Sequence, residues 1–294
     1  NMQHKSYIVQ EQVAEMQQSE RVALQMITRD IRMAGLGLQF CNDAAGGKII
    51  FSNGTGNNNS DTIGVEYHSF SPKPEGETEI TTNVPAISAS SELDVKDTTG
   101  FNNNDWVMVA GGEECQYAIF YVDTVDAGTK KLHHTSTSKL TYGYKLTSGF
   151  MIGDRVRRLN REDGGRIIYA IDGSYILTRS VDDGAAQPLA DNIEDMQIAY
   201  GIDINNNGVV ADGKFGVVPG GEWFDDPTGR DMTLLREIKL TLVARTTRED
   251  PAYNAGARPA VEDNPAAPAA DGFRRRVLQT TVKLRNIDET VARF

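Results

Sequence analysis

One segment of the chain has the residue types and spacing of a calcium-binding loop. Residues 203–212 read D-I-N-N-N-G-V-V-A-D. In such loops, oxygen ligands at positions one, three and five converge on one cation, a glycine makes the turn, and a carbonyl at position seven adds a ligand. The expected ligands are Asp203, Asn205, Asn207, the carbonyl of Val209, and Asp212. We interpret the loop as a Ca²⁺ site of modest affinity, because it contains only two carboxylates and has Lys214 where an EF-hand has its glutamate. The alternative is an Asx-rich turn without metal.

The two cysteines, Cys41 and Cys115, leave two interpretations open. They are either buried free thiols or a single disulfide. A disulfide that closes a loop of this length would stabilise the fold by roughly 4 kcal/mol through chain entropy. The sequence contains no C-x-x-C motif, so thiol redox chemistry is not expected.

Catalytic motifs are absent from the sequence, which has no G-x-S-x-G, H-E-x-x-H, Walker or Rossmann pattern. We therefore expect no enzymatic activity. The adjacent His133 and His134 lie in a Lys/Thr-rich segment, where a solvated loop is favoured over a metal site. Four arginines lie close together, at positions 155, 157, 158 and 161. They form either a basic stripe for an acidic partner or cross-strand ion pairs, and we favour the pairs.

The charge balance limits the classes of partner. The 294 residues carry a formal net charge of −11, which argues against nucleic acid and anionic lipid as partners. No segment has the length of a membrane span or the layout of a signal peptide. A targeting or membrane segment is expected upstream of residue 1.

The first 36 residues predict an amphipathic stem helix. No proline or glycine occurs from Tyr7 to Ala34, and apolar residues recur at steps of three or four, with a gap at Glu20. Gly35 then favours a left-handed C-cap. A helix over this range is roughly 42 Å long.

The remaining residues, 37–294, predict a β-rich head, so the fold class is α+β, with the helix packed on an antiparallel sheet. Short β segments over about 78–153, among them one apolar strand over 117–125, indicate an inserted β subdomain, and residues 154–294 form the main sheet. Asp163-Gly164-Gly165 and Asp172-Gly173 predict hairpins between strands. Residues 237–245 and 276–285 alternate with period two, as strands with one buried face do. A polar, mobile loop is expected over 249–272, and exposed arginines over 274–276.

Four stretches together resemble the PilW-type minor pilins of bacterial type IV pili. They are residues 27–35 (ITRDIRMAG), 189–203 with the following Asn/Gly loop, 100–109 before Cys115, and 274–286. The resemblance implies a pilin-like fold, a cleaved signal peptide and a hydrophobic half-helix upstream of residue 1. It also implies an oxidising cell-envelope compartment, which favours the Cys41–Cys115 disulfide.

The resemblance further implies a structural function, as a minor pilin in the tip or priming complex that promotes pilus assembly and contributes to adhesion. Expected partners are other minor pilins, the major pilin, a large tip adhesin, and the inner membrane through the upstream segment. Assembly would move the protein from inner membrane and periplasm to the extracellular pilus tip. The apolar helix stripe is the expected partner-helix interface, with Val13, Met16, Leu24, Ile27 and Ile31. The alternatives are a type II secretion pseudopilin and a calcium-dependent extracellular binding module.

Overall fold

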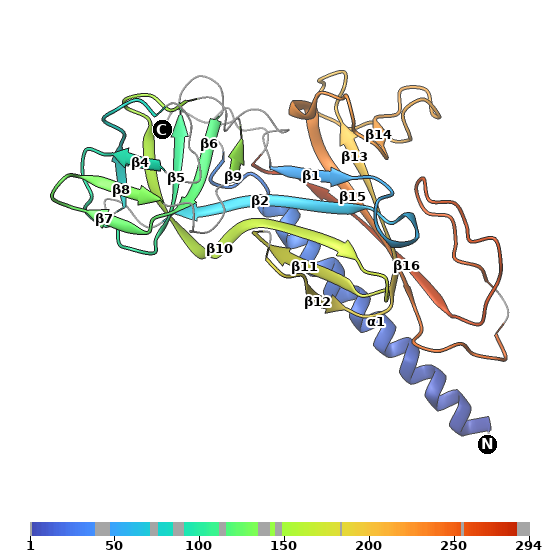
Figure 1. Ribbon diagram of the computed structural model, residues 1–294. Coiled ribbons are helices and arrows are strands. Elements are labelled where there is room, and N and C mark those ends of the chain that lie inside the picture. The colour runs from blue at the N-terminus through green and yellow to red at the C-terminus, as the bar shows by residue number, and fades with distance from the viewer. Residues whose placement is uncertain are drawn as a thin grey trace. The chain divides into compact units, whose positions relative to one another are not determined.

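The computed structural model describes residues 2–38, 48–70, 76–84, 91–111, 116–134, 142–144, 149–182, 184–253 and 256–286 (Figure 1). The chain forms two compact units. The first unit comprises Asn1–Ala34, Lys48–Glu66 and Arg166–Asp288, and the second comprises Gly35–Gly47, Tyr67–Gly165 and Glu289–Phe294. The second unit is thus wider than the insert predicted over 78–153. Strands β2 (Thr62–Phe70) and β10 (Arg155–Ile171) each run from one unit into the other.

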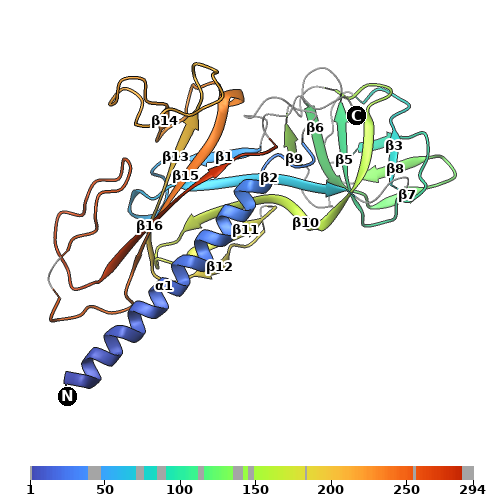
Figure 2. The same cartoon turned by 180° about the vertical axis from the view of Figure 1, so that it is seen from behind.

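The first unit contains the long helix α1 (Met2–Met33), as its uninterrupted helix-forming sequence predicts. Gly35 follows the helix with a φ of +80°, a left-handed conformation that glycine adopts without a Cβ clash. The helix packs on β15, β16 and β12 (Figure 2). None of the described helices is apolar over a stretch long enough to cross a membrane.

A four-stranded antiparallel sheet forms the seat for this helix. Its strand order is β14 (Trp223–Phe224), β13 (Ile193–Ile202), β15 (Leu235–Arg245) and β16 (Arg275–Lys283). Side chains of β13 are buried along its whole length. β16 alternates as predicted, whereas β15 is buried on both faces from Leu240 to Ala244, which corrects the prediction of one exposed face there. Short 3₁₀ turns lie at Asn57–Asn59 and Met232–Leu234.

The first unit also contains strands that do not belong to this four-stranded sheet. β1 (Ile49–Ser52) pairs with the first part of β2, and β11 (Leu177–Val181) pairs with both the last part of β10 and β12 (Gln187–Ala190). The described residues therefore form a mostly β protein with one long helix, in agreement with the predicted α+β class.

The second unit is built from hairpins around the first part of β10. β3 (Glu77–Glu79) and β5 (Trp106–Gly111) flank β10, followed by β6 (Gln116–Tyr121) and β9 (Tyr142–Tyr144). A smaller sheet has the order β4 (Ser91–Asp94), β8 (Lys131–His134) and β7 (Thr124–Asp126). The apolar core of the second unit contains Leu93, Phe120, Leu132 and Val156, all fully buried.

Two strand predictions were wrong. The Asp-Gly-Gly segment at residues 163–165 makes no hairpin, because β10 is one strand from Arg155 to Ile171. Gly164 has a φ of +156°, and a Cβ there would lie 2.5 Å from the carbonyl oxygen of Tyr67, so the glycine permits a close passage of backbone. The apolar segment 117–125 is also two strands, β6 and β7, rather than one.

Candidate functional site

The buried face of α1 rests on its own sheet. Ile27 and Ile31 have no exposed surface, and Met16 is 5% exposed. Val13 and Leu24 are partly buried at the margins of this face. The structure thus places three of the five predicted partner-helix residues inside the first unit, where they fix the helix to the sheet.

A buried polar cluster fixes the rotation of α1. Tyr169 Oη on β10 donates to Asp30 Oδ2 at 2.6 Å, and Arg179 Nη2 on β11 lies 3.3 Å from the same oxygen. Asp30 is only 3% exposed. Burial, followed by the neighbouring Asp30 carboxylate, raises the pKa of Tyr169 well above its usual value, so the phenol remains a hydrogen-bond donor.

The gap in the apolar stripe is filled by a buried carboxylate. Glu20 has no exposed surface, and Arg276 Nε on β16 lies 3.2 Å from its Oε2. Burial raises the pKa of Glu20 to about 7, although the guanidinium of Arg276 and that of Arg21 act in the opposite direction. Among the described residues, neither oxygen of Glu20 accepts a hydrogen bond. The pair therefore fixes the position of the helix along the sheet, although removing the two charged groups from water costs desolvation free energy.

The outward face of α1 is the candidate surface for other proteins. Tyr7 is 64% exposed and Val22 is 42% exposed. A line of outward residues recurs at helical spacing and is called the outward seam: Ile8, Glu11, Glu15, Val22, Met26 and Arg29. Its acids lie in the first half of the helix, and its arginine lies in the second half.

The calcium-like loop is closed by its own hydrogen bonds. The buried Asp203 carboxylate accepts the backbone N–H groups of Asn207 at 3.0 Å and Gly208 at 2.8 Å. Asn205 donates its side-chain amide to Glu222 at 2.9 Å. The N–H of Ala211 donates to the other oxygen of Glu222 at 2.8 Å.

Glu222 is thus the second carboxylate in the hydrogen bonding of this loop. Asp212 and Val209 are exposed, whereas Glu222 is buried beside Asn205. Glu222 lies outside the motif, and the sequence offers no signal for it. Within the described part of the chain, no three His, Cys, Asp or Glu side chains form a metal-binding group.

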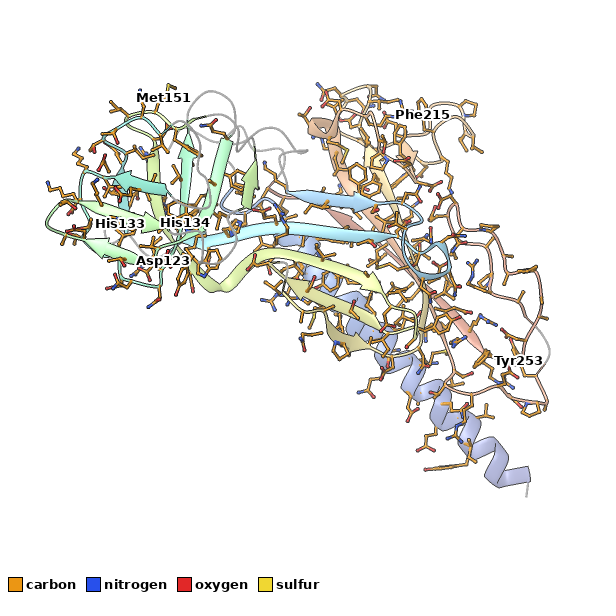
Figure 3. The ribbon with its side chains drawn as sticks, in the orientation of Figure 1. Asp123, His133, His134, Met151, Phe215 and Tyr253 are labelled. Carbon is orange, nitrogen blue, oxygen red and sulfur yellow. The ribbon has the colours of Figure 1, made fainter. Side chains whose placement is uncertain are left out.

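The cysteines and the adjacent histidines are the other residues that the sequence offers for chemistry. Cys41 and Cys115 lie outside the described residues. His133 and His134 lie on strand β8, so their side chains point to opposite faces (Figure 3). His133 contacts Glu92, and His134 Nδ1 lies 2.9 Å from the carbonyl oxygen of Tyr121. The pair is thus part of a strand, which corrects the loop prediction.

Three of the four arginines on β10 form ion pairs, as favoured from the sequence, and the side chain of Arg161 lies outside the described part of the structure. Arg155 and Arg157 lie 3.3 and 3.8 Å from Glu77 on β3. Arg158 lies 3.7 Å from Asp105. Arg157 also stacks over the Phe70 ring at 3.9 Å.

The connection between β15 and β16 is anchored, which corrects the expectation of a mobile loop. Arg258, from the middle of this connection, donates to the fully buried Asp195 on β13 at 2.8 Å. Asn264 donates to the same carboxylate oxygen at 2.9 Å. The expectation of exposed arginines over 274–276 was also wrong, because the Arg275 side chain is only 8% exposed and pairs with Glu194 and Asp271.

The fold of the first unit defines the architectural class: a long N-terminal helix packed on an antiparallel sheet. Residues 172–286 match the family model of PilW, the type IV pilus-assembly protein W. This segment contains all four strands of the sheet that seats α1. The chain is PilW-like over that segment, and the resemblance predicted from the sequence is confirmed.

Among solved structures, the type IV-like pilin TTHA1219 from Thermus thermophilus is similar. It is 15% identical, the alignment covers 63% of this chain and 86% of that chain, and the TM-score is 0.27. No curated protein matches the chain.

Proposed function

We propose that the chain is a minor pilin, a structural subunit of the tip or priming complex of a type IV pilus. The observation that supports this most directly is the seating of α1 on the segment that matches PilW. The buried face holds the helix on that sheet, and the outward face remains exposed, with Tyr7 at 64%. An exposed helix with apolar and charged positions is suited to packing beside other helices.

The partners in this proposal are other minor pilins, the major pilin and a large tip adhesin. The protein would work in the cell envelope, where a hydrophobic segment upstream of residue 1 would hold it in the inner membrane before assembly.

A second surface suits the adhesin. Exposed apolar side chains gather on the connection between β13 and β14, namely Ile204, Val209, Phe215, Val217 and Val218. Phe215 stacks on Phe224 at 4.7 Å, and Arg230 lies over both rings. Exposed apolar patches on a fixed backbone are typical of protein–protein contact sites.

We also propose that the 203–222 loop binds Ca²⁺ weakly. Asp203, Asn205 and Asn207 would supply the side-chain oxygens, with Glu222 as the second carboxylate. Arg236 Nε lies 4.0 Å from Asp203 Oδ2, so its charge opposes the cation, and a Kd of roughly 10⁻⁴–10⁻³ M is expected. Calorimetric titration of the wild type and of Asp203→Asn with CaCl₂ tests this. Equal heats from the two proteins would refute the site.

The pilin function is tested by gene deletion and complementation with the full-length protein. We expect few or no pili in the deletion strain and restoration by the wild type. Ile8→Asp, at an exposed position of the seam, should restore fewer pili although the head folds normally. Gln10→Asp, at an exposed position on another side of the helix, is the matched control. Normal piliation in the deletion strain would refute the proposal. Lost type II secretion with normal piliation would assign the chain to a secretion pseudopilus.

A further inference from the structure

Arg245, the last residue of β15, lies between two aromatic rings of the first unit. Its guanidinium carbon is 3.8 Å from the ring centre of Tyr175 and 4.4 Å from that of Phe273. These two rings, both in the described part of the chain, make no contact with each other, so the guanidinium separates them. Aromatic rings beside a guanidinium fix its plane and exclude water from its faces.

The guanidinium of Arg245 has no hydrogen-bond acceptor among the described residues. Its Nε is buried and makes no hydrogen bond there, whereas the two terminal nitrogens, Nη1 and Nη2, are not buried. These terminal nitrogens therefore form the accessible edge of the group. A cation that has lost water on its faces and at Nε attracts an anion more strongly than a fully hydrated cation does. The fork of N–H donors at this edge matches the two oxygens of a carboxylate.

A second arginine, at the end of the sheet where β15 ends and β16 begins, has the acceptor that Arg245 lacks. Arg274 lies over the ring of Tyr253 at 4.4 Å. It also donates to the carboxylate of Asp250, from Nε at 3.2 Å and from Nη2 at 2.8 Å. Arg274 thus combines an aromatic ring with a carboxylate, whereas Arg245 has two rings and, among the described residues, no carboxylate that accepts a hydrogen bond from it.

The acids at this end of the sheet already have partners. Both oxygens of Asp271 accept hydrogen bonds from Arg275 at 2.6 Å, and one of them also accepts the backbone N–H of Phe273 at 3.0 Å. Glu194 accepts from Arg275 Nη2 at 2.9 Å. The pKa of Asp271 is lowered, first by its hydrogen bond to Arg275 and only to a smaller extent by the charge of Arg245. An acceptor for Arg245 therefore has to come from outside the described residues.

Tyr175 has a backbone conformation that a tyrosine rarely adopts. Its φ is +61°, in the left-handed region that is uncommon for a bulky residue. The carboxylate of Asp172 accepts the backbone N–H groups of Ser174 at 2.8 Å and Ile176 at 2.9 Å, which fixes the turn on both sides of Tyr175. Strained residues of this kind concentrate at binding sites. Here the strained turn places an aromatic ring on the guanidinium of Arg245.

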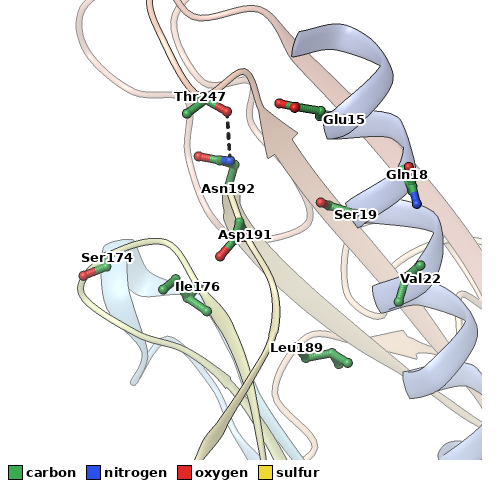
Figure 4. A pocket seen from close by; sticks show the side chains of 10 residues that line it. All are labelled: Glu15, Gln18, Ser19, Val22, Ser174, Ile176, Leu189, Asp191, Asn192 and Thr247. Atoms are coloured by element: carbon green, nitrogen blue, oxygen red, sulfur yellow. Dashed lines mark hydrogen bonds between the residues drawn. The ribbon is translucent and has the colours of Figure 1, made fainter. Parts of the chain in front are cut away.

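The backbone of Arg245 is fixed by the turn before β13. Its N–H donates to the carbonyl of Asn192 at 3.0 Å, and the Asn192 side chain donates to Thr247 at 3.2 Å (Figure 4). This turn also forms part of a groove of about 580 Å³ along α1, whose lining contains Glu15 and Asp191 but no lysine or arginine. The groove therefore repels an anion, and Arg245 is not part of its lining.

We propose that the guanidinium of Arg245, held between Tyr175 and Phe273, binds the carboxylate of an acidic side chain of a partner protein. The three arginines and three acids described at this end of the sheet carry no net charge together, so a carboxylate with one negative charge is favoured over a phosphate dianion. Arginine and tyrosine are enriched among the residues that dominate the binding energy of protein interfaces. A role of this contact in a pilus rests on the proposed function.

An anion titration of the purified chain tests the site. The reporter is the Nε–H signal of Arg245 in ¹H–¹⁵N NMR spectra, which is assigned by its loss in Arg245→Lys. Replacing sodium chloride with sodium acetate at constant ionic strength should shift this signal along a saturating curve, with a Kd of roughly 10–100 mM. Arg230 is the matched control, because it is exposed and lies over two rings that stack on each other, Phe215 and Phe224. A linear shift no larger than that of Arg230 would overturn the proposal.

Tyr175→Gly tests whether the stacked ring contributes to binding. Glycine adopts the positive φ of this position without strain, so the variant should fold. Loss of one ring returns water to the guanidinium and should weaken acetate binding by roughly two- to fivefold. Unchanged acetate binding in the folded variant would overturn recognition by a guanidinium held between two rings.

Two peptides identify the source of the carboxylate. Acetyl-Gly-Glu-Gly-amide should shift the Arg245 signal at concentrations no higher than those of acetate, and acetyl-Gly-Gln-Gly-amide should not shift it. A response to acetate without a response to the glutamate peptide would assign the site to small free acids and overturn the protein partner. These outcomes are distinct from those of the gene deletion. A normally piliated deletion strain refutes the pilus function, whereas a failed acetate titration refutes only the carboxylate site.

Discussion

The buried Glu20 should make the stability of the fold depend on pH. Its pKa is about 7 in the folded chain against an ordinary value of 4.5. The folded state therefore binds a proton that the unfolded state releases between these pH values, so the free energy of unfolding falls as pH rises through this window. The two pKa values differ by an amount equivalent to about 3 kcal/mol at 1.36 kcal/mol per pH unit. Residual solvation makes about 1–3 kcal/mol the realistic range.

The perturbation is Glu20→Gln, which keeps the side-chain shape and removes the titration. Urea unfolding of both proteins at pH 5 and pH 8 measures the effect. Asp61 also has its pKa raised to about 7 by burial, so the wild-type slope contains more than one group. The difference between wild type and variant isolates Glu20, and Glu15→Gln on the exposed face serves as control. Equal pH dependence in wild type and Glu20→Gln would refute the reasoning.

Three further substitutions test what holds the first unit together, each by urea unfolding monitored by circular dichroism. Tyr169→Phe removes a buried donor to a carboxylate and should cost about 1.5–3 kcal/mol, so a loss under 0.5 kcal/mol would contradict the described contact. Arg258→Ala leaves Asp195 buried without its cation and should cost about 3–5 kcal/mol, with partial recovery in Arg258→Ala/Asp195→Asn. Ile27→Ala should cost about 2–5 kcal/mol, whereas Val22→Ala on the exposed face should stay within about 0.5 kcal/mol. Similar losses for these last two would mean that the helix is seated on another face.

Features with a local cause could be predicted from the sequence. The helix follows from the absence of proline and glycine before Gly35, and β15 and β16 follow from their period-two alternation. The polar contacts that determine the packing could not be predicted, because each joins residues far apart in the chain. In the sequence, Glu20 only interrupts the apolar stripe, because its ion-pair partner Arg276 lies far away in the chain.

The same reason explains the errors of interpretation. Arg258 lies in a Pro/Ala-rich segment that is typical of a loose loop, and only Asp195 on a distant strand gives it a buried partner. Asp163-Gly164-Gly165 has the composition of a turn, but Gly164 instead allows the backbone of Tyr67 to pass close to β10. In the calcium-like loop, the motif contains Asp203 and Asn205, while the acid that completes the hydrogen bonding, Glu222, lies beyond it.

Because the chain is synthesised from its N-terminus, the packing of α1 on the sheet has a further consequence. The helix is made first, but two of the strands on which it packs, β15 (Leu235–Arg245) and β16 (Arg275–Lys283), lie near the other end of the chain. Contacts between distant segments form slowly, and uncovered apolar surface favours aggregation in the meantime. Until β16 has been translated and paired, the sheet that covers the stripe of α1 is incomplete, so a nascent chain stalled before Arg275 should remain dependent on chaperones or on a membrane for its solubility.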